Sequence, residues 1–187
     1  MLQNKDKSQL TNKDNAQLIL DFFHRTMMHH AMWFSEVQHQ LGKEKALEAL
    51  DEAWSKSISI QMKRIAKTLD FEMENNIPKP LLDLSSEKLQ KLRDAMAANW
   101  LANDGVWFQS VEFTRGMNDA KRCNDSCWGQ FSPFEAWSIK RQLELPENSG
   151  LDGLKKALKF RLYAFINEQS FDKETEVNKV FDFKDLT

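Results

Sequence analysis

Apolar residues recur along this chain at alternating steps of three and four positions, and this spacing constrains its fold more than any other feature. Such steps place the apolar side chains on one face of an α-helix. The clearest run consists of Phe23, Met27, His30, Phe34, Val37 and Leu41. It predicts a helix over residues 14–41, and similar runs predict a second helix over 43–69 and a long third helix from about residue 85.

Few residues interrupt these helices. The 187 residues include 6 glycines and 4 prolines, which is typical of long helices rather than of a turn-rich β fold. Gly42 is expected to end the first helix. The Asn-Asn-Ile-Pro-Lys-Pro segment at 75–80 is expected to be a connector after the second helix. The third helix is expected to end between Gly116 and Gly129.

A capping box marks the expected start of a further helix. In Ser132-Pro133-Phe134-Glu135 the serine can cap a helix, the proline suits its first position, and the glutamate follows three residues after the cap. We therefore predict a helix from Pro133 to about Leu143. Another helix is predicted from about Leu151 to about Arg161, after a polar loop.

Near the C-terminus the helical spacing gives way to alternation. Tyr163–Phe171 and Lys179–Phe183 alternate apolar and polar residues, and the polar residues 172–178 separate them. This pattern is typical of a β-hairpin over 163–184. The predicted fold class is therefore mainly α, a helical bundle of about five helices with a small C-terminal hairpin. Residues 1–13 are expected to be a flexible tail, and residues 14–187 a single domain.

The charge of the chain argues against binding to nucleic acids, and its hydropathy argues against insertion into a membrane. The formal net charge of −2 gives no sign of the basic surface that binds nucleic acids. No stretch approaches the roughly 18 apolar residues of a membrane span, and the polar N-terminal segment lacks the apolar core of a signal peptide. We therefore expect a cytoplasmic protein whose two cysteines are reduced thiols.

Polar residues interrupt the apolar face of the third helix. Asn103 and Asp104 stand among large aromatic residues. A lone buried carboxylate is too costly in free energy. These residues therefore either line a pocket, with Asp104 as a ligand or general base, or form a buried polar network that fixes helix packing. Glu112 precedes Arg115 and Asp119 at helical spacing, which favours an ion-pair ladder or, if that carboxylate is desolvated, a second general base.

A metal site is one chemistry that these residues allow. Glu36 and His39 form a Glu-x-x-His motif on the first helix, and His29 lies seven residues before Glu36 on the same face. With Asp104 or Glu112 from another helix, they would supply nitrogen and oxygen ligands for a divalent zinc, manganese or iron ion. The alternative is a solvated helix face.

The two cysteines, Cys123 and Cys127, are four residues apart, which is about one helical turn if the helix continues. Two ligands are too few for a structural zinc site. Because Lys121 and Arg122 are close in sequence, a nucleophilic or metal-binding thiol at Cys123 is one interpretation. A pair of packing thiols is the other.

One short segment of the chain resembles another. Trp33-Phe34-Ser35-Glu36-Val37 is similar to Trp107-Phe108-Gln109-Ser110-Val111-Glu112, and both place a carboxylate about one turn after an aromatic pair. We find no internal repeat of solenoid period.

Three segments together resemble a known family: Trp33–Gly42 (WFSEVQHQLG), Asn99–Glu112 (NWLANDGVWFQSVE) and Lys121–Glu135 (KRCNDSCWGQFSPFE). They are similar to a bacterial and archaeal family of uncharacterised cytosolic proteins, over nearly the whole chain to about Phe171. That family is distantly similar to the L-2-amino-thiazoline-4-carboxylate hydrolase-like group. This resemblance implies an α+β domain and hydrolysis of a C–N or C–S bond in a small heterocycle. Leu186 stands where the resemblance implies a cysteine, which leaves open a second alternative, an inactive member that acts only as a binding module.

Three functions fit these residues. The first is metal-assisted hydrolysis of a small heterocyclic or amide-like compound, with Asp104 or Glu112 as the base. The second is a non-enzymatic homodimer that binds a small-molecule ligand in a regulatory role. The third is a thiol-based sensor that uses Cys123 and Cys127.

Overall fold

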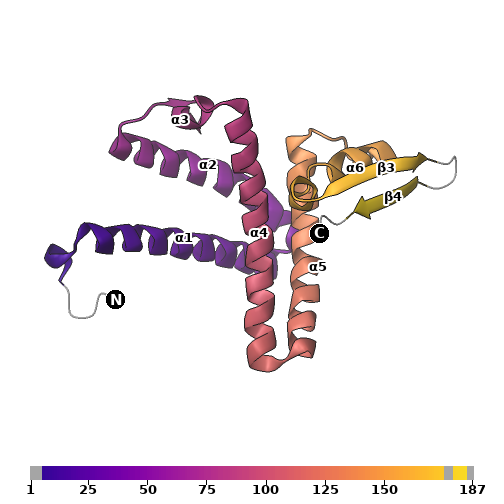
Figure 1. The fold of residues 1–187 in the computed structure, drawn as a ribbon, viewed down its shortest axis with the longest axis horizontal. Helices are drawn as coiled ribbons and strands as arrows, with labels where there is room; N and C mark the ends of the chain where they lie inside the picture. The colour runs from indigo at the N-terminus through magenta and orange to yellow at the C-terminus, as the bar shows by residue number, and fades with distance from the viewer. Residues whose placement is uncertain (1–5, 175–178, 185–187) are drawn as a thin grey trace. The chain divides into compact units, whose positions relative to one another are not determined.

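The computed structural model describes residues 6–174 and 179–184, with side-chain surroundings for residues 6–167. The chain divides into two compact units, Met1–Lys79 (unit 1) and Pro80–Thr187 (unit 2), and each is described by itself. The mainly helical class predicted from the sequence is confirmed, since the described residues form six α-helices (Figure 1). Within those residues no helix combines the length and the apolar character that crossing a membrane requires.

Unit 1 is built on a helical hairpin. α1 (Asn12–Leu41) and α2 (Lys43–Leu69) lie side by side, joined by Gly42 alone (Figure 1). Gly42 has a φ of +86°, which residues with a Cβ rarely adopt, and this lets one residue end α1 and start α2. In the segment predicted as a tail, the structure describes a short 3₁₀ helix, η1 (Lys7–Gln9). Thr11 then caps α1, its hydroxyl accepting the backbone N–H of residue 14 at 3.2 Å.

A two-residue turn follows α2. β1 (Met73–Glu74) pairs antiparallel with β2 (Ile77–Pro78), and Asn75 and Asn76 between them have φ values of +48° and +65°. Two-residue hairpin turns of type I′ need positive φ at both positions, which asparagine tolerates. The sequence predicted only a connector here, because two prolines and two asparagines interrupt a helix. Ser59 Oγ donates to Asn76 Oδ1 over 3.1 Å and holds the turn against α2.

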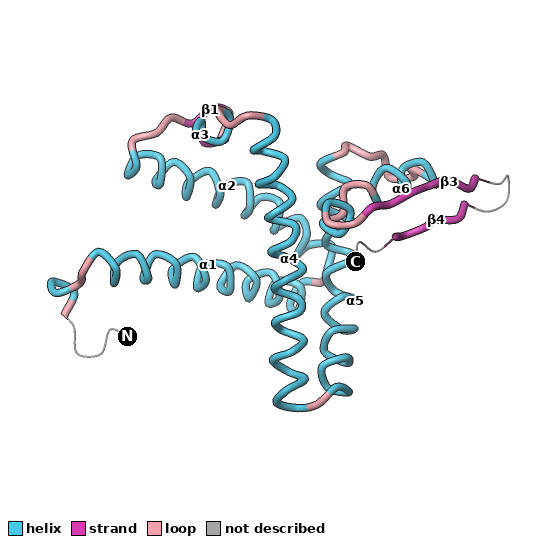
Figure 2. The backbone as a smooth tube through the Cα atoms, in the orientation of Figure 1, coloured by secondary structure: helices cyan, strands magenta, loops and turns pink. Residues whose placement is uncertain are grey.

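Unit 2 contains a second helical hairpin. α4 (Ser86–Arg115) is followed by Gly116, with a φ of +94°, and then by α5 (Met117–Gln142) (Figure 2). Ser85 caps α4 through its hydroxyl, which accepts the N–H of residue 88 at 3.3 Å. A short helix, α3 (Lys79–Leu82), precedes this hairpin at the boundary between the units.

The structure corrects the predicted helix start at Pro133, which lies inside an uninterrupted α5. Proline has no N–H, so the carbonyl of Gly129, four residues earlier, loses its helical donor. Glu135, predicted as a capping residue, is instead buried with 6% of its surface exposed. Its carboxylate accepts hydrogen bonds from Arg161 Nε and from the backbone N–H of Leu162, each at 2.9 Å. A contact distant in sequence therefore overrides the local capping signal.

The helices and strands that follow α5 are shorter than those of the two hairpins. After α5 it forms α6 (Gly150–Leu158), η2 (Leu162–Phe165), β3 (Glu168–Glu174) and β4 (Lys179–Lys184). The backbones of β3 and β4 pair antiparallel, with Gln169 opposite Phe183 (Figure 2). The sequence predicted the first hairpin strand from Tyr163, but Tyr163 belongs to η2, where backbone hydrogen bonds close three-residue turns. Part of the predicted hairpin loop, residues 175–178, lies outside the described residues, as does Leu186.

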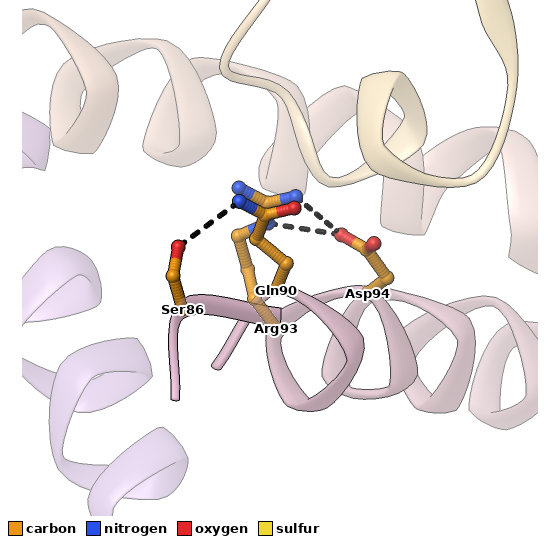
Figure 3. A network of polar contacts seen from close by, with 4 residues as sticks. All are labelled: Ser86, Gln90, Arg93 and Asp94. Carbon is orange, nitrogen blue, oxygen red and sulfur yellow. Dashed lines mark hydrogen bonds and ion pairs between the residues drawn. The ribbon is translucent and has the colours of Figure 1, made fainter. Parts of the chain in front are cut away.

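A cluster on the first turns of α4 anchors η2. Figure 3 shows Gln90 Nε2 donating to Ser86 Oγ over 3.4 Å. It also shows the Nε and Nη2 groups of Arg93 donating to one oxygen of Asp94 at 2.9 and 2.8 Å. The same guanidinium lies over the Phe165 ring, 4.6 Å from its centroid, in a cation–π contact. The cation–π contact joins α4 to the segment after α6, while the hydrogen bonds orient side chains within α4.

Small residues lie at the seam of each helical hairpin. Ala46 of α2 and Ala120 of α5 are each 1% exposed, and among the described residues no large side chain is fully buried. Because alanine projects only a methyl group, two helices can approach closely around it. Large apolar residues of α1 remain at least half exposed, for example Phe23 at 50% and Trp33 at 61%.

Candidate functional site

A pocket between α4 and α5 contains both cysteines. Its volume is about 170 Å³, and it is lined by Asn103, Asp104, Trp107, Phe108, Val111, Ala120, Cys123, Asn124 and Cys127. We call it the thiol pocket. The aromatic rings form one wall, while a carboxylate, two amides and two thiols supply the polar groups.

Helical spacing brings these groups together. Asp104 and Phe108 are four residues apart on α4, so they share a face, and Cys123 and Cys127 have the same separation on α5. The sharp turn at residue 116 folds α5 back along α4. Ala120 also lines the pocket and is almost fully buried, and its small side chain lets the two helices approach closely.

The thiols are accessible and have no bond to one another. Cys123 and Cys127 are both exposed and reduced. The two cations that the sequence placed beside Cys123 are each paired with a carboxylate. Lys121 Nζ lies 3.1 Å from Asp125, and the Arg122 guanidinium lies 2.9 Å from a carboxylate one turn before it. Neither cation lines the thiol pocket.

Two of the three residues predicted as catalytic meet in this pocket. Asp104, half-buried, and Cys123 line the same space. Glu112 is also half-buried but does not line it. Asn124 does line it, and the sequence analysis passed over this residue. Its position four residues after Ala120, on the inner face of α5, is the signal that would have identified it.

The residues predicted as metal ligands are divided between the units. His29, Glu36 and His39 are exposed on α1. Glu36 Oε1 accepts a hydrogen bond from Gln40 Nε2 at 2.7 Å, and the His29 ring lies edge-on to Trp33 with 6.4 Å between centroids. The other predicted ligands, both carboxylates, belong to unit 2. Across the described part of the chain, no three histidine, cysteine or acidic side chains gather as a metal site would require. The metal site stays a prediction.

Unit 1 has two adjoining hollows between α1 and α2. The smaller, of about 270 Å³, is lined by His30, Trp33, Phe34, Val37, Ala46, Ala49, Leu50 and Ala53. The larger, of about 610 Å³, is lined by Thr26, Met27, His29, His30, Trp33, Ala53, Trp54, Ser57 and Gln61. We call the larger hollow the histidine–tryptophan groove.

His30 lines both hollows. From the sequence it belongs to the apolar stripe of the first helix, and the structure places it half-buried on that stripe. Its ring lies edge-on to Trp54, with 6.1 Å between centroids. Trp54 is 52% exposed at the groove.

The two helical hairpins are equivalent at an offset of 74 residues. Their capping residues Thr11 and Ser85, their hinge glycines, and the buried alanines of their second helices all keep this offset. α1 and α4 each have 30 residues. The identical pairs include Trp33 and Trp107, Phe34 and Phe108, Val37 and Val111, Gly42 and Gly116, Ala46 and Ala120, and Trp54 and Trp128. The short resemblance noted in the sequence is thus part of a duplication of the whole hairpin.

The residues that line the smaller hollow of unit 1 and the thiol pocket of unit 2 are also related by the offset of 74 positions. Each of the eight residues around the smaller hollow of unit 1 has its equivalent among the nine around the thiol pocket of unit 2. Four substitutions change the chemistry. His30 corresponds to Asp104, Leu50 corresponds to Asn124, and two alanines, at positions 49 and 53, correspond to Cys123 and Cys127. The pocket of unit 2 therefore has a carboxylate, an amide and two thiols at positions where unit 1 has one imidazole and three apolar side chains.

Comparisons with known proteins place the chain in a family. Neither the curated proteins nor the solved structures include a significant match to it. A family of unknown function, DUF6125, matches two successive segments, residues 7–81 and 81–187, which meet beside the boundary between the two units. The chain belongs to the DUF6125 family.

Proposed function

We propose that this protein is a thiol-based sensor in which oxidation of Cys123 and Cys127 changes the conformation of α5. The observation that carries the proposal is the thiol pocket itself, where two exposed, unbonded thiols one turn apart share a small space with Asp104. A packing role for the cysteines is less well supported, because packing thiols are usually buried.

The chemistry requires one oxidant, a peroxide. The thiolate of one cysteine attacks a peroxide oxygen, which breaks the O–O bond, forms a sulfenic acid and releases water after protonation. The second thiol then attacks the sulfenic sulfur, forming the S–S bond and releasing a second water. Two thiols and one hydrogen peroxide thus give one disulfide and two water molecules. A thiol reductant reverses the reaction by exchange.

The signal would arise from a mismatch in geometry. Side chains four apart on a helix have Cβ atoms about 5–6 Å apart, whereas a disulfide requires about 3.5–4.5 Å. Closing the bond would therefore distort α5. The adjacent turns are suited to yield, because Gly129 lowers helix propensity and Pro133 removes one backbone hydrogen bond.

The proposal is tested by treating the whole protein with hydrogen peroxide. We expect an intramolecular disulfide, seen as a loss of about 2 Da in the intact mass, and faster amide hydrogen exchange over residues 117–133. The Cys123→Ser and Cys127→Ser variants serve as matched controls and should show neither change. Stable sulfenic or higher oxidation products without a disulfide, or a disulfide without a change in exchange, would contradict the proposal.

Two earlier hypotheses have weaker support. Metal-assisted hydrolysis draws on Asp104 in the thiol pocket, but its ligands lie in both units. Neither comparison supports the similarity to the L-2-amino-thiazoline-4-carboxylate hydrolase-like group. A homodimer is favoured by the exposed apolar side chains of α1, among them Phe22, Phe23 and Met27. Light scattering at several protein concentrations tests it, and a constant monomer mass would exclude it.

A further inference from the structure

The histidine–tryptophan groove is open in unit 1 because of two substitutions relative to unit 2. At the offset of 74 residues, Thr26 corresponds to Trp100 and Ser57 corresponds to Phe131. In unit 2 these two aromatic rings are stacked, with 5.8 Å between centroids and 23° between planes. Small polar residues therefore stand in unit 1 where unit 2 has a stacked aromatic pair.

The aromatic pair of unit 2 covers a tryptophan that unit 1 leaves exposed. Trp100 lies edge-on to Trp128, with 5.5 Å between centroids, and Trp128 is half-buried. Its equivalent, Trp54, is 52% exposed at the groove. The groove volume of about 610 Å³ falls within the range of about 300–1,000 Å³ that is usual for small-molecule sites.

We propose that the histidine–tryptophan groove binds a planar aromatic carboxylate, whose ring takes the place that Trp100 and Phe131 occupy in unit 2. The walls suit a flat ring, because Trp33 and Trp54 present aromatic surfaces for edge-to-face or offset contact. In unit 2 the chain itself provides the aromatic rings at this place. In unit 1 the bound ligand would provide the aromatic ring instead.

The polar lining selects a carboxylate. No acidic residue is among the described residues that line this groove, whereas His29 and His30 bring two imidazoles. The hydroxyl of Ser57 accepts a hydrogen bond from Gln61 Nε2 at 2.6 Å, which leaves its own proton to donate. Imidazole N–H and hydroxyl groups are donors that an anionic oxygen accepts well. The proposal does not rest on the thiol chemistry of unit 2.

The test uses 2-naphthoate as a probe with the full-length protein in isothermal titration calorimetry. We expect saturable 1:1 binding. Cyclohexanecarboxylate, which has the charge without the flat ring, and 2-naphthamide, which has the ring without the charge, should each bind at least tenfold more weakly. Absence of 2-naphthoate binding would overturn the proposal, and so would equal binding of either analogue.

Substitutions that copy unit 2 locate the site. Thr26→Trp combined with Ser57→Phe should close the groove and weaken 2-naphthoate binding at least tenfold. The matched control Thr26→Val with Ser57→Thr keeps a hydroxyl at position 57 and adds no ring, so its groove should stay open and bind 2-naphthoate like the original protein. If the first variant does not fold by circular dichroism, Thr26→Trp alone replaces it. Unchanged binding in a folded closed-groove variant would overturn the proposal. A Cys123→Ser, Cys127→Ser variant should bind like the original protein, which separates this site from the thiol pocket.

Discussion

Arg161 Nε donates to the Glu135 carboxylate across 2.9 Å and thereby ties the middle of α5 to the segment after α6. The second oxygen of Glu135 accepts the backbone N–H of Leu162 at 2.9 Å. Both oxygens of a buried carboxylate are therefore used. The Glu135 side chain is therefore engaged with the segment after α6 and caps no helix at Pro133.

Replacing Glu135 by alanine should destabilise unit 2. The change leaves the Arg161 guanidinium without this partner and the Leu162 N–H without an acceptor, which costs about 2–4 kcal/mol of unfolding free energy. Urea denaturation followed by circular dichroism measures it. Glu135→Gln retains an acceptor for the backbone N–H and should lose less. A loss below about 0.5 kcal/mol in the alanine variant would show that the carboxylate does not hold these segments together.

The hinge glycines should respond differently from a helical glycine. Gly42→Ala and Gly116→Ala force a Cβ into a backbone region with φ of +86° and +94°, and each should cost about 1–3 kcal/mol. Gly105 lies inside α4, and a Cβ added there meets no atom within 4 Å. Gly105→Ala should therefore stabilise the protein by about 1 kcal/mol. Thermal unfolding of the three variants checks the contrast, and equal shifts in Tm would contradict it.

The seam between α4 and α5 should not tolerate a larger side chain. Ala120 is 1% exposed, so Ala120→Leu would force the helices apart and cost about 1–3 kcal/mol. The matched control is Ala136→Leu on the exposed side of α5, which should change the stability by less than about 0.5 kcal/mol. Chemical denaturation provides the comparison. If the two variants are equally stable, the alanine seam does not set the helix spacing.

Pro133 offers a way to separate stability from sensing. Pro133→Ala restores a backbone N–H for the carbonyl of Gly129 and should stabilise α5, by up to about 3 kcal/mol. The same change should reduce the rise in hydrogen exchange that peroxide causes over residues 117–133, because the adjacent turns resist distortion. Disulfide formation can be followed in parallel by mass. Unaltered exchange in the oxidised variant would show that these turns play no part in the response.

The spacing of apolar residues predicted α1 and α2 well, since their boundaries depend on a long periodic face and on Gly42. It predicted α5 poorly at Pro133, because a capping box is a local signal and the carboxylate of Glu135 is used by residues more than twenty positions away. The prolines and asparagines at 75–80 indicated only that the helix ends, and strands of two residues are too short to leave an alternating pattern in the sequence, so the turn at Asn75 and Asn76 was not predicted.

The candidate site was predicted in part. Asp104 and Cys123 were selected for their chemistry, and the structure places both in one pocket. The groove of unit 1 was not foreseen, because an open groove results from residues that are small, and Thr26 and Ser57 carry no functional signal of their own. They become informative only when aligned with Trp100 and Phe131, and that alignment required the hinges and caps to establish the offset.

Because the hairpin is present twice in one chain, each copy can serve as the control for a substitution in the other. Any substitution in one copy can be paired with the corresponding substitution 74 residues away, in the same solution, at the same concentration and with the same backbone geometry around it. Effects that both positions share then belong to the architecture of the hairpin. Effects that only one position shows belong to what that copy has acquired, whether a pair of thiols or an open aromatic groove.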